Sequence, residues 1–202
     1  VSCGSQEALF LAIACSMDVS EEIIIPNPSY MGYLPSVELL NVNPVALQLK
    51  ESNKFGINPD ELKKLINKKK TKAIMLNSPS NPTGNVMKKS AMEEIADIAV
   101  DNDLYIFSDE AYEKIVYDKK FVSIGSLNGM HKHVVTFHSF SKTYAMCGYR
   151  LGYAIGPRKL IDAMTNAHMY TSIAAPTLSQ LVGVKALEIK QSYIDNMVSI
   201  YR

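Results

Sequence analysis

The residues of this chain that are best suited to chemistry stand just after short apolar segments. Lys142 ends the run His-Ser-Phe-Ser-Lys after one such segment, and Asp109 and Tyr112 lie in the run Ser-Asp-Glu-Ala-Tyr after another. A buried lysine is costly because its ammonium group loses its hydration, so a lysine at this place indicates a use for its amine. An amine can bond to a carbonyl carbon, and a carboxylate such as that of Asp109 either caps the next turn or faces a cationic ligand atom. Arg150, shortly after Lys142, adds a planar cation suited to an anion.

Three further segments add polar groups of other kinds. Gly4, Ser5 and Gln6 precede an apolar helical pattern, and a glycine-containing turn into a helix start offers free N–H groups to a phosphate. Tyr30 ends the run Asn-Pro-Ser-Tyr and could stack on a planar ligand. Asn81 lies in Asn-Ser-Pro-Ser-Asn-Pro-Thr-Gly, where prolines fix the backbone and an X–Pro bond could be cis. Taken singly, these segments are explained equally well as a helix cap, a packing tyrosine and a turn.

Taken together, the segments supply a phosphate-binding turn, an aromatic ring, a carboxylate, hydroxyl and amide donors, an amine and a guanidinium. This set suits a planar, phosphorylated cofactor that carries a nitrogen atom and a reactive carbonyl. Pyridoxal phosphate has these features, since its aldehyde requires a lysine and its ring nitrogen requires an anionic partner. The segments meet if each follows a parallel strand, because ligands of open α/β sheets bind beyond the carboxyl ends of the strands.

Strands and helices that could position these segments alternate along the chain. Short apolar runs, typical of strands buried on both faces, predict strands at residues 22–26, 45–49, 73–76, 104–107, 134–137 and 151–155. Capping signals and apolar periodicity predict helices at residues 5–17, from residue 58, and at 90–100. We interpret the charge run at 63–72, centred on Lys68, Lys69 and Lys70, as the solvated end of the second helix. The pattern predicts an α/β fold with three layers, α/β/α, and a mostly parallel sheet in one domain.

The composition excludes several classes of protein. The 202 residues are 47% hydrophobic and 20% charged, which is typical of a globular domain. The 21 basic and 20 acidic residues nearly balance, so neither nucleic acid nor an anionic membrane is an expected partner. The longest apolar run, residues 8–15, is far shorter than the roughly 20 residues that span a bilayer. The 3 cysteines are widely spaced, which favours free thiols in the cytoplasm, and the 4 histidines share no spacing typical of a metal site.

Five strings of this sequence resemble the class I and II aminotransferases of the aspartate aminotransferase type, which bind pyridoxal phosphate on the fold type I scaffold. The strings are GSQEAL from Gly4, NPSY ending at Tyr30, NSPSNPTG from Asn77, SDEAY from Ser108 and SFSKTYAMCGYRLGY from Ser139. The last string is the most specific, because it holds a lysine flanked by Ser and Thr and an arginine farther on. The resemblance covers almost the whole chain, in order and at compatible spacings.

The resemblance implies a role for each matching residue. Lys142 would bond to the cofactor's aldehyde carbon and later carry the α-proton of the substrate, and Asp109 would pair with the pyridine N–H. Asn81 and Tyr112 would hydrogen-bond the oxygen of the ring. Tyr30 would stack on the ring. The phosphate would be held by Gly4, Ser5, Gln6, Ser139 and Arg150, with Ser141 as a weaker candidate. Cys147 is interpreted as a packing thiol, and Tyr33 either lines the site entrance or packs in the core.

The implied reaction moves an amino group from an L-amino acid, of aspartate or aromatic type, to a 2-oxo acid. The family also implies a homodimer. Its members are usually about twice this long, so residues 1–202 are expected to be the cofactor-binding large domain, without the N-terminal arm and C-terminal small domain. Alone, this domain is expected to be inactive or a weak catalyst. Two alternatives stay open. One is another fold type I enzyme, such as a carbon–sulfur lyase or an aminocyclopropane carboxylate synthase, and the other is the aminotransferase-like sensor domain of a transcription regulator.

Overall fold

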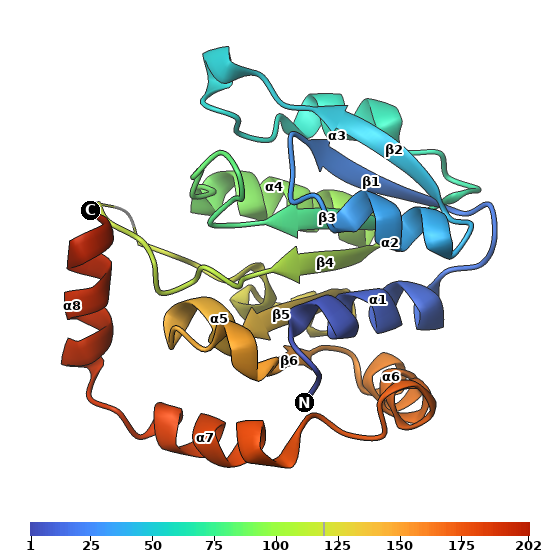
Figure 1. Ribbon diagram of the computed structural model, residues 1–202. Helices are drawn as coiled ribbons and strands as arrows, with labels where there is room; N and C mark the ends of the chain where they lie inside the picture. The colour runs from blue at the N-terminus through green and yellow to red at the C-terminus, as the bar shows by residue number, and fades with distance from the viewer. Residues whose placement is uncertain (119) are drawn as a thin grey trace.

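A single six-stranded sheet is the centre of the computed structural model, which describes residues 1–118 and 120–202. The strand order is β2-β1-β3-β4-β5-β6, and the pairs are parallel except for β5 and β6, which are antiparallel (Figure 1). The prediction of a mostly parallel sheet is confirmed. The strands are β1 (Glu22–Asn27), β2 (Asn43–Gln48), β3 (Thr71–Asn77), β4 (Tyr105–Asp109), β5 (Val134–Ser139) and β6 (Gly152–Ile155).

Helices cover both faces of this sheet and complete the three predicted layers. One face carries α1 (Ser5–Ser16), α2 (Tyr33–Leu39) and α6 (Arg158–Thr171). The other face carries α3 (Pro59–Leu65) and α4 (Lys89–Asp101). The remaining helices are α5 (Phe140–Thr143), α7 (Thr177–Leu187), α8 (Gln191–Tyr201) and the 3-10 turns η1 (Glu51–Asn53), η2 (Ile124–Ser126), η3 (Met130–Lys132) and η4 (Cys147–Tyr149).

Two buried hydrophobic clusters hold the layers together. Ala73 and Met75 of β3 belong to the cluster under α1, whereas their neighbours Ile74 and Leu76 belong to the cluster under α4. Successive side chains of a strand point to opposite faces, so a strand that is apolar at every position suits a sheet covered on both sides. The short apolar runs of the sequence are strands for this reason.

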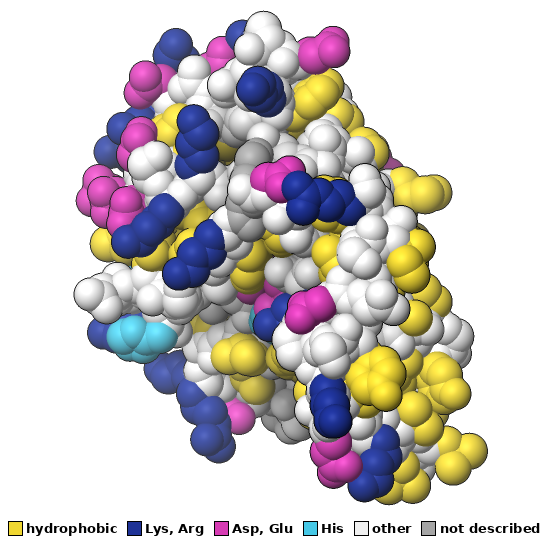
Figure 2. Space-filling view, turned by 90° about the vertical axis from the view of Figure 1, so that its left-hand side faces the viewer, with side chains coloured by type: hydrophobic (Ala, Val, Ile, Leu, Met, Phe, Trp, Pro, Cys, Tyr) yellow, Lys and Arg dark blue, Asp and Glu magenta, His cyan; other side chains and the backbone are white. Residues whose placement is uncertain are grey.

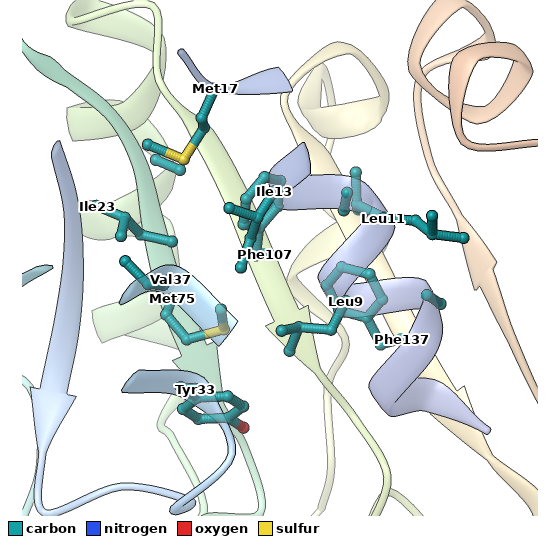
Figure 3. Packing of buried hydrophobic residues seen from close by; sticks show 14 of the residues in the cluster. Leu9, Leu11, Ile13, Met17, Ile23, Tyr33, Val37, Met75, Phe107 and Phe137 are labelled. Atoms are coloured by element: carbon teal, nitrogen blue, oxygen red, sulfur yellow. The ribbon is translucent and has the colours of Figure 1, made fainter. Parts of the chain in front are cut away.

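Helix α1 joins the hydrophobic core to the edge of the sheet at which the parallel strands end. Its side chains Leu9 and Ile13 are buried and lie toward Phe137 and Phe107 of the sheet (Figure 3). Burying one such side chain contributes about 1.5–3 kcal/mol. This packing fixes the axis of α1 and therefore the position of its first turn.

The predicted elements agree with the observed ones except in two respects. The six predicted strands and three predicted helices are all present, with boundaries that shift by a few residues. The interpretation of the lysine run is confirmed for Lys63 and Lys64, which lie in the last turn of α3. It is wrong for the centre of the run, because α3 ends at Leu65 and Lys68, Lys69 and Lys70 lie beyond it, in the turn before β3. That turn is closed by the Asn67 side chain, which accepts a hydrogen bond of 3.0 Å from the Lys69 N–H. Helices α2, α5, α6, α7 and α8 were not among the predicted elements.

The last two helices, α7 and α8, lie along the rim of the molecule, away from the middle of the sheet (Figure 1). Ser179 and Gly183 are the buried residues of α7, and a Cβ on Gly183 would come within 2.4 Å of the Leu151 side chain. The large apolar side chains of α7 point outward instead, and Leu178 and Leu181 are 76% and 61% exposed. Among the described residues, no helix combines the length and apolar character needed to traverse a bilayer.

The direction of the strands brings the polar segments to one edge. The parallel strands β1, β3, β4 and β5 all end there. Because β6 is antiparallel to β5, it begins at this edge, where Gly152 pairs with Ser139. Ser2 forms an isolated bridge with Gly152, which places the start of α1 at the same edge.

Candidate active site

A cavity of about 210 Å³ opens at this edge of the sheet. Figure 2 looks onto the edge and shows a hollow near the middle, where acidic and basic side chains lie together among apolar ones. All of the sequence-predicted site residues except Gly4 line the cavity, namely Ser5, Gln6, Tyr30, Asn81, Asp109, Tyr112, Ser139, Ser141, Lys142 and Arg150. Leu9, Asn77, Ala111 and Cys147 complete the lining.

Gly4 and Arg150 form an anion-binding corner at the start of α1. Gly4 precedes α1 with a φ of 81°, a conformation that favours glycine, and no side chain caps the helix there. A Cβ on Gly4 would lie 2.5 Å from Nη2 of Arg150, so the missing side chain is what makes room for the guanidinium. Arg150 is itself in the left-handed region, and its Nη1 donates a hydrogen bond of 2.9 Å to the carbonyl of Cys147. The first N–H groups of a helix and a guanidinium together suit a phosphate.

Gln6 also lies in this corner, but its side chain is held elsewhere. Its Nε2 donates to Oγ of Ser36 at 3.0 Å and to the carbonyl of Gly32 at 3.4 Å, so the side chain ties α1 to α2. The backbone N–H of Gln6 is in the first turn of α1 and has no carbonyl partner within that helix. The part of Gln6 suited to an anion is therefore its backbone.

Lys142 lies in the short helix α5, directly after β5. Ser139 caps this helix, because its Oγ accepts a hydrogen bond of 3.2 Å from the N–H of Ser141. Sγ of Cys147 donates to the carbonyl of Ser141 at 3.2 Å, which joins the end of this turn to the Arg150 segment. The ammonium Nζ of Lys142 is 5.7 Å from the centre of the Tyr112 ring. The amine and the phenol that the sequence singled out are thus neighbours.

Asp109 is the buried carboxylate of the site and is 9% exposed. Its Oδ2 accepts a hydrogen bond of 2.7 Å from the Tyr33 hydroxyl, and its Oδ1 accepts one of 3.1 Å from the Ala111 N–H. Burial raises the pKa of the Asp109 carboxyl, and these two hydrogen bonds oppose that shift. A carboxylate held in this way is poised to face a cationic ligand atom.

Tyr33 and Asn77 support the site and were not predicted as site residues. Tyr33 is fully buried, so its expected packing in the core is confirmed and its alternative placement at the site entrance is wrong. Burial and the Asp109 carboxylate raise the pKa of Tyr33 well above its ordinary value, so its hydroxyl keeps the proton that it donates. Asn77 donates to the Asp109 carbonyl at 3.0 Å and accepts from the Asn81 N–H at 2.7 Å, which ties the loop after β3 to the end of β4. Local sequence gave no signal for the hydrogen bonds of Tyr33 and Asn77 to Asp109, because Asp109 lies in β4, 76 and 32 residues away along the chain.

Tyr30 and the Asn81 loop border the cavity from β1 and β3. The Tyr30 ring packs edge-on against Tyr33, with 5.4 Å between ring centres and 77° between planes. The peptide bonds before Pro79 and Pro82 are both cis, in agreement with the prediction of a cis bond in this loop, and the bond before Pro28 is also cis. The wall of the cavity thus contains the anion-binding corner at Arg150 and the buried carboxylate of Asp109. The amine of Lys142 and the phenol of Tyr112 line the same cavity.

The chain is similar to known proteins of one family. The family model described as aminotransferase class I and II matches residues 1–202. The chain is 42% identical to an aspartate aminotransferase of Pyrococcus abyssi over 94% of its length and 40% identical to an aromatic-amino-acid aminotransferase of Thermococcus litoralis over 96%, but it covers only 49% and 50% of those proteins. It superimposes on the crystal structure of an aromatic aminotransferase from Pyrococcus horikoshii with a TM-score of 0.94 and 38% identity, covering 98% of this chain and 54% of that one. The chain therefore spans about half the length of the relatives that it matches.

Proposed function

The chain belongs to the aminotransferase class I and II family, and on that premise we propose that residues 1–202 are the pyridoxal-phosphate-binding domain of an aminotransferase. The reaction would transfer an amino group from an L-amino acid to a 2-oxo acid. The observation that carries this proposal is one cavity lined by Lys142, Asp109 and Arg150, with the uncapped start of α1 at its wall.

The residues of the cavity fit the proposed cofactor at two separate points. The Gly4–Arg150 corner has the space, the cation and the helix N–H groups that a phosphate needs. The buried Asp109 carboxylate accepts two hydrogen bonds and lines the cavity. A protonated pyridine nitrogen would supply a positive charge that stabilises this carboxylate against the cost of its burial. Pyridoxal phosphate, when bound, supplies an aldehyde that combines with amines and a ring that accepts the electrons of the broken Cα–H bond.

The protein side chains would then bind, orient and move protons. Lys142 would supply the amine that holds the cofactor. Once the substrate amine replaces it, Lys142 would take the proton from the substrate Cα and deliver it to the former aldehyde carbon of the cofactor. Asp109 would keep the ring nitrogen protonated. Tyr112 and Asn81 would donate hydrogen bonds to the ring oxygen, and Tyr30 would stack on the ring.

The phosphate would be held from two helix starts and by one guanidinium. At α1, the backbone N–H groups of Ser5 and Gln6 would contribute with the close approach that Gly4 allows. At α5, the hydroxyls of Ser139 and, more weakly, Ser141 would contribute. Arg150 would bind two phosphate oxygens through its planar group.

The substrate, the assembly and the compartment belong to the same proposal. An aspartate or aromatic donor is proposed because relatives of both kinds are similar to this chain. A homodimer is proposed because α7 presents a row of exposed apolar side chains. A cytoplasmic location is proposed because Cys3, Cys15 and Cys147 are free thiols. A lyase or a sensor domain gains no support, since the similar proteins named above are aminotransferases.

A single-turnover experiment tests the proposed reaction. The full-length protein that contains this domain is purified, loaded with pyridoxal phosphate and mixed with L-aspartate or L-phenylalanine without any 2-oxo acid acceptor, and the products are measured. One equivalent of the matching 2-oxo acid without free ammonia is expected, and Lys142→Ala should lose this product while the control Lys114→Ala keeps it. Release of ammonia or of an altered carbon skeleton would favour a lyase, and no product from a panel of amino acids would contradict amino transfer.

A further inference from the structure

The ends of β4 and β5 carry a second polar cluster on the face opposite the cavity. Asp109 and Ser139 line the cavity, whereas their chain neighbours Glu110 and His138 do not. Successive strand residues point to opposite faces, so these neighbours lie on the side of the sheet that α4 covers, together with Thr136. Glu113, in the turn after β4, completes the cluster.

Glu110 has one satisfied and one unsatisfied carboxylate oxygen. The residue is 1% exposed, and its Oε1 accepts hydrogen bonds from Ser108 at 3.0 Å and Ser123 at 2.8 Å. Within residues 1–118 and 120–202, its buried Oε2 has no hydrogen-bond partner. A buried carboxylate oxygen without a partner is costly, so it requires an explanation.

His138 is held firmly and also keeps one nitrogen without a hydrogen-bond partner. Its ring stacks on Tyr153 with 4.7 Å between centres and 16° between planes, and Nε2 is 3.0 Å from Oγ1 of Thr136. Nδ1 is buried and has no hydrogen bond to any part of the chain that the structure describes. Nε2 is 4.0 Å from Oε2 of Glu110, and Nδ1 is 3.7 Å from Oε2 of Glu113, which is too long for hydrogen bonds.

The charges around His138 favour a cation. The two carboxylates face it from the segment after β4, and Lys114 is the cation that acts on Glu113. The phenols of Tyr144 and Tyr153 also face Glu113.

We propose that Glu110, Glu113 and His138 form a binding site for one divalent transition-metal ion, of which Zn²⁺ is the best match. One ligand atom from each residue lies within 4.8 Å of the others. One imidazole and two carboxylates are a donor set that Zn²⁺ accepts, and three protein ligands leave one position for water.

Small movements bring the ligands to bonding geometry. Bonds of about 2.0–2.2 Å place the ligand atoms of a tetrahedral zinc ion about 3.3 Å apart. Glu113 has the most freedom to move, because its side chain is partly exposed. Glu110 and His138 must also approach each other, because Oε2 of Glu110 is 4.0 Å from Nε2 of His138. The contact from Nε2 of His138 to Thr136 also resembles the supporting hydrogen bond that orients a metal-bound histidine.

The metal site has no part in the proposed amino transfer and lies on the opposite face of the sheet from the cavity. A bound ion would join the turn after β4 to β5, next to Asp109 and Ser139 on the other face of the same strands. The spacing of the three ligands in the sequence gave no sign of a metal site. The fold brings them together because β4 and β5 are paired and end at the same edge.

Titration of the purified protein with ZnCl₂, followed by isothermal calorimetry and equilibrium dialysis, tests the site. One Zn²⁺ per chain is expected, with Glu113→Gln and His138→Asn each weakening the affinity by about tenfold or more. The controls Glu93→Gln, on the exposed face of α4, and His133→Asn, outside the cluster, should bind like the parent protein. Co²⁺ in place of Zn²⁺ should give visible absorption bands that are lost in the same two variants.

Two results would overturn the proposal. One is a parent protein that binds no Zn²⁺ in saturable, one-to-one fashion. The other is a Glu113→Gln variant, shown to be folded by circular dichroism, that keeps the parent affinity and the Co²⁺ spectrum. Glu113 is partly exposed, so this variant decides the question even if His138→Asn fails to fold.

Discussion

The carboxyl edge of the sheet and the C-terminal helices α7 and α8 are built in opposite ways. At the edge, polar side chains are fixed by specific partners, as Asp109 is by Tyr33 and Ala111. In α7 and α8, the buried residues are Ser179, Gly183 and Ile194, and most large apolar side chains face outward. The edge is therefore organised by the core beneath it, while the two helices present a surface suited to another protein surface.

The elements that position the cavity are therefore different from the helices that present an exposed apolar surface. The edge is positioned by α1 and by strands that are buried on both faces, and among the described residues α7 and α8 contribute none to the lining of the cavity. Changes at the edge should therefore alter cofactor binding and chemistry, whereas changes on the outer face of α7 should alter assembly.

The largest effect is expected for Asp109→Asn. The amide cannot supply the negative charge that keeps a pyridine nitrogen protonated, so the rate of amino transfer should fall by about 10²–10³-fold. Single-turnover kinetics with the donor amino acid measure this rate. Asp97→Asn, an exposed carboxylate of α4, is the control, and an Asp109→Asn variant as fast as this control would remove Asp109 from the proposed chemistry.

The next effect is expected for Tyr33→Phe and depends on pH. The folded Asp109 carboxyl has a pKa above its ordinary value of 3.8, so the folded state binds the proton more tightly and stability falls as the pH rises from that value through the folded pKa. Removing the Tyr33 donor should raise this pKa further. The variant should then lose about 1–3 kcal/mol at neutral pH and much less where Asp109 is protonated.

Urea unfolding of the cofactor-free protein at neutral pH and at lower pH measures this dependence. The matched control is Tyr105→Phe, which removes a half-buried hydroxyl from β4 and leaves the hydrogen bonds of Asp109 intact. A loss for Tyr33→Phe that is the same at every pH would show that the hydroxyl does not act through the Asp109 carboxyl.

Gly4→Ala should have a smaller effect, a loss of cofactor affinity at the anion-binding corner formed by Gly4 and Arg150. The added Cβ would meet the Arg150 guanidinium at 2.5 Å and displace it from the start of α1, so phosphate-dependent cofactor affinity should fall about tenfold. Gly129→Ala is a control for an alanine at positive φ, because Gly129 has a φ of +83° and its new Cβ would meet no described atom within 4 Å. The backbone cost is about 1–2 kcal/mol at Gly129, which is in the left-handed region, and larger at Gly4, where ψ is 164°. Cofactor affinity is therefore compared in variants shown to be folded, and equal affinity in the two would argue against the corner.

The smallest effect on the fold is expected for Leu181→Ser on the outer face of α7. This side chain is 61% exposed, so the free energy of unfolding of the monomer should change by no more than about 0.5 kcal/mol. Light scattering should show a shift toward monomer if α7 contacts a second copy. Leu9→Ala, in the core under α1, should instead cost about 2–5 kcal/mol, and equal losses for the two variants would contradict the separation of the two regions.

The strands and the residues of the site could be predicted because their signals are local. A run such as residues 73–76 is apolar at every position, and Lys142 and Asp109 directly follow such runs. Helix α7 gave no signal, because small residues, Ser179 and Gly183, are its buried residues while its large apolar side chains face outward. The sequence left Tyr33 between the site entrance and the core because its bond to Asp109 joins positions 76 residues apart. Glu110, Glu113 and His138 meet only through the pairing of β4 and β5.

Reductive trapping is the most direct test of the central claim, that the carboxyl edge of this sheet is a pyridoxal phosphate site. The protein is mixed with pyridoxal phosphate and reduced with borohydride, and the modified lysine is located by peptide mass spectrometry. We predict one adduct, at Lys142, that is lost in a folded Lys142→Ala variant and unchanged in Lys114→Ala. An adduct spread over several surface lysines, with no preference for Lys142 in a folded protein, would contradict the site.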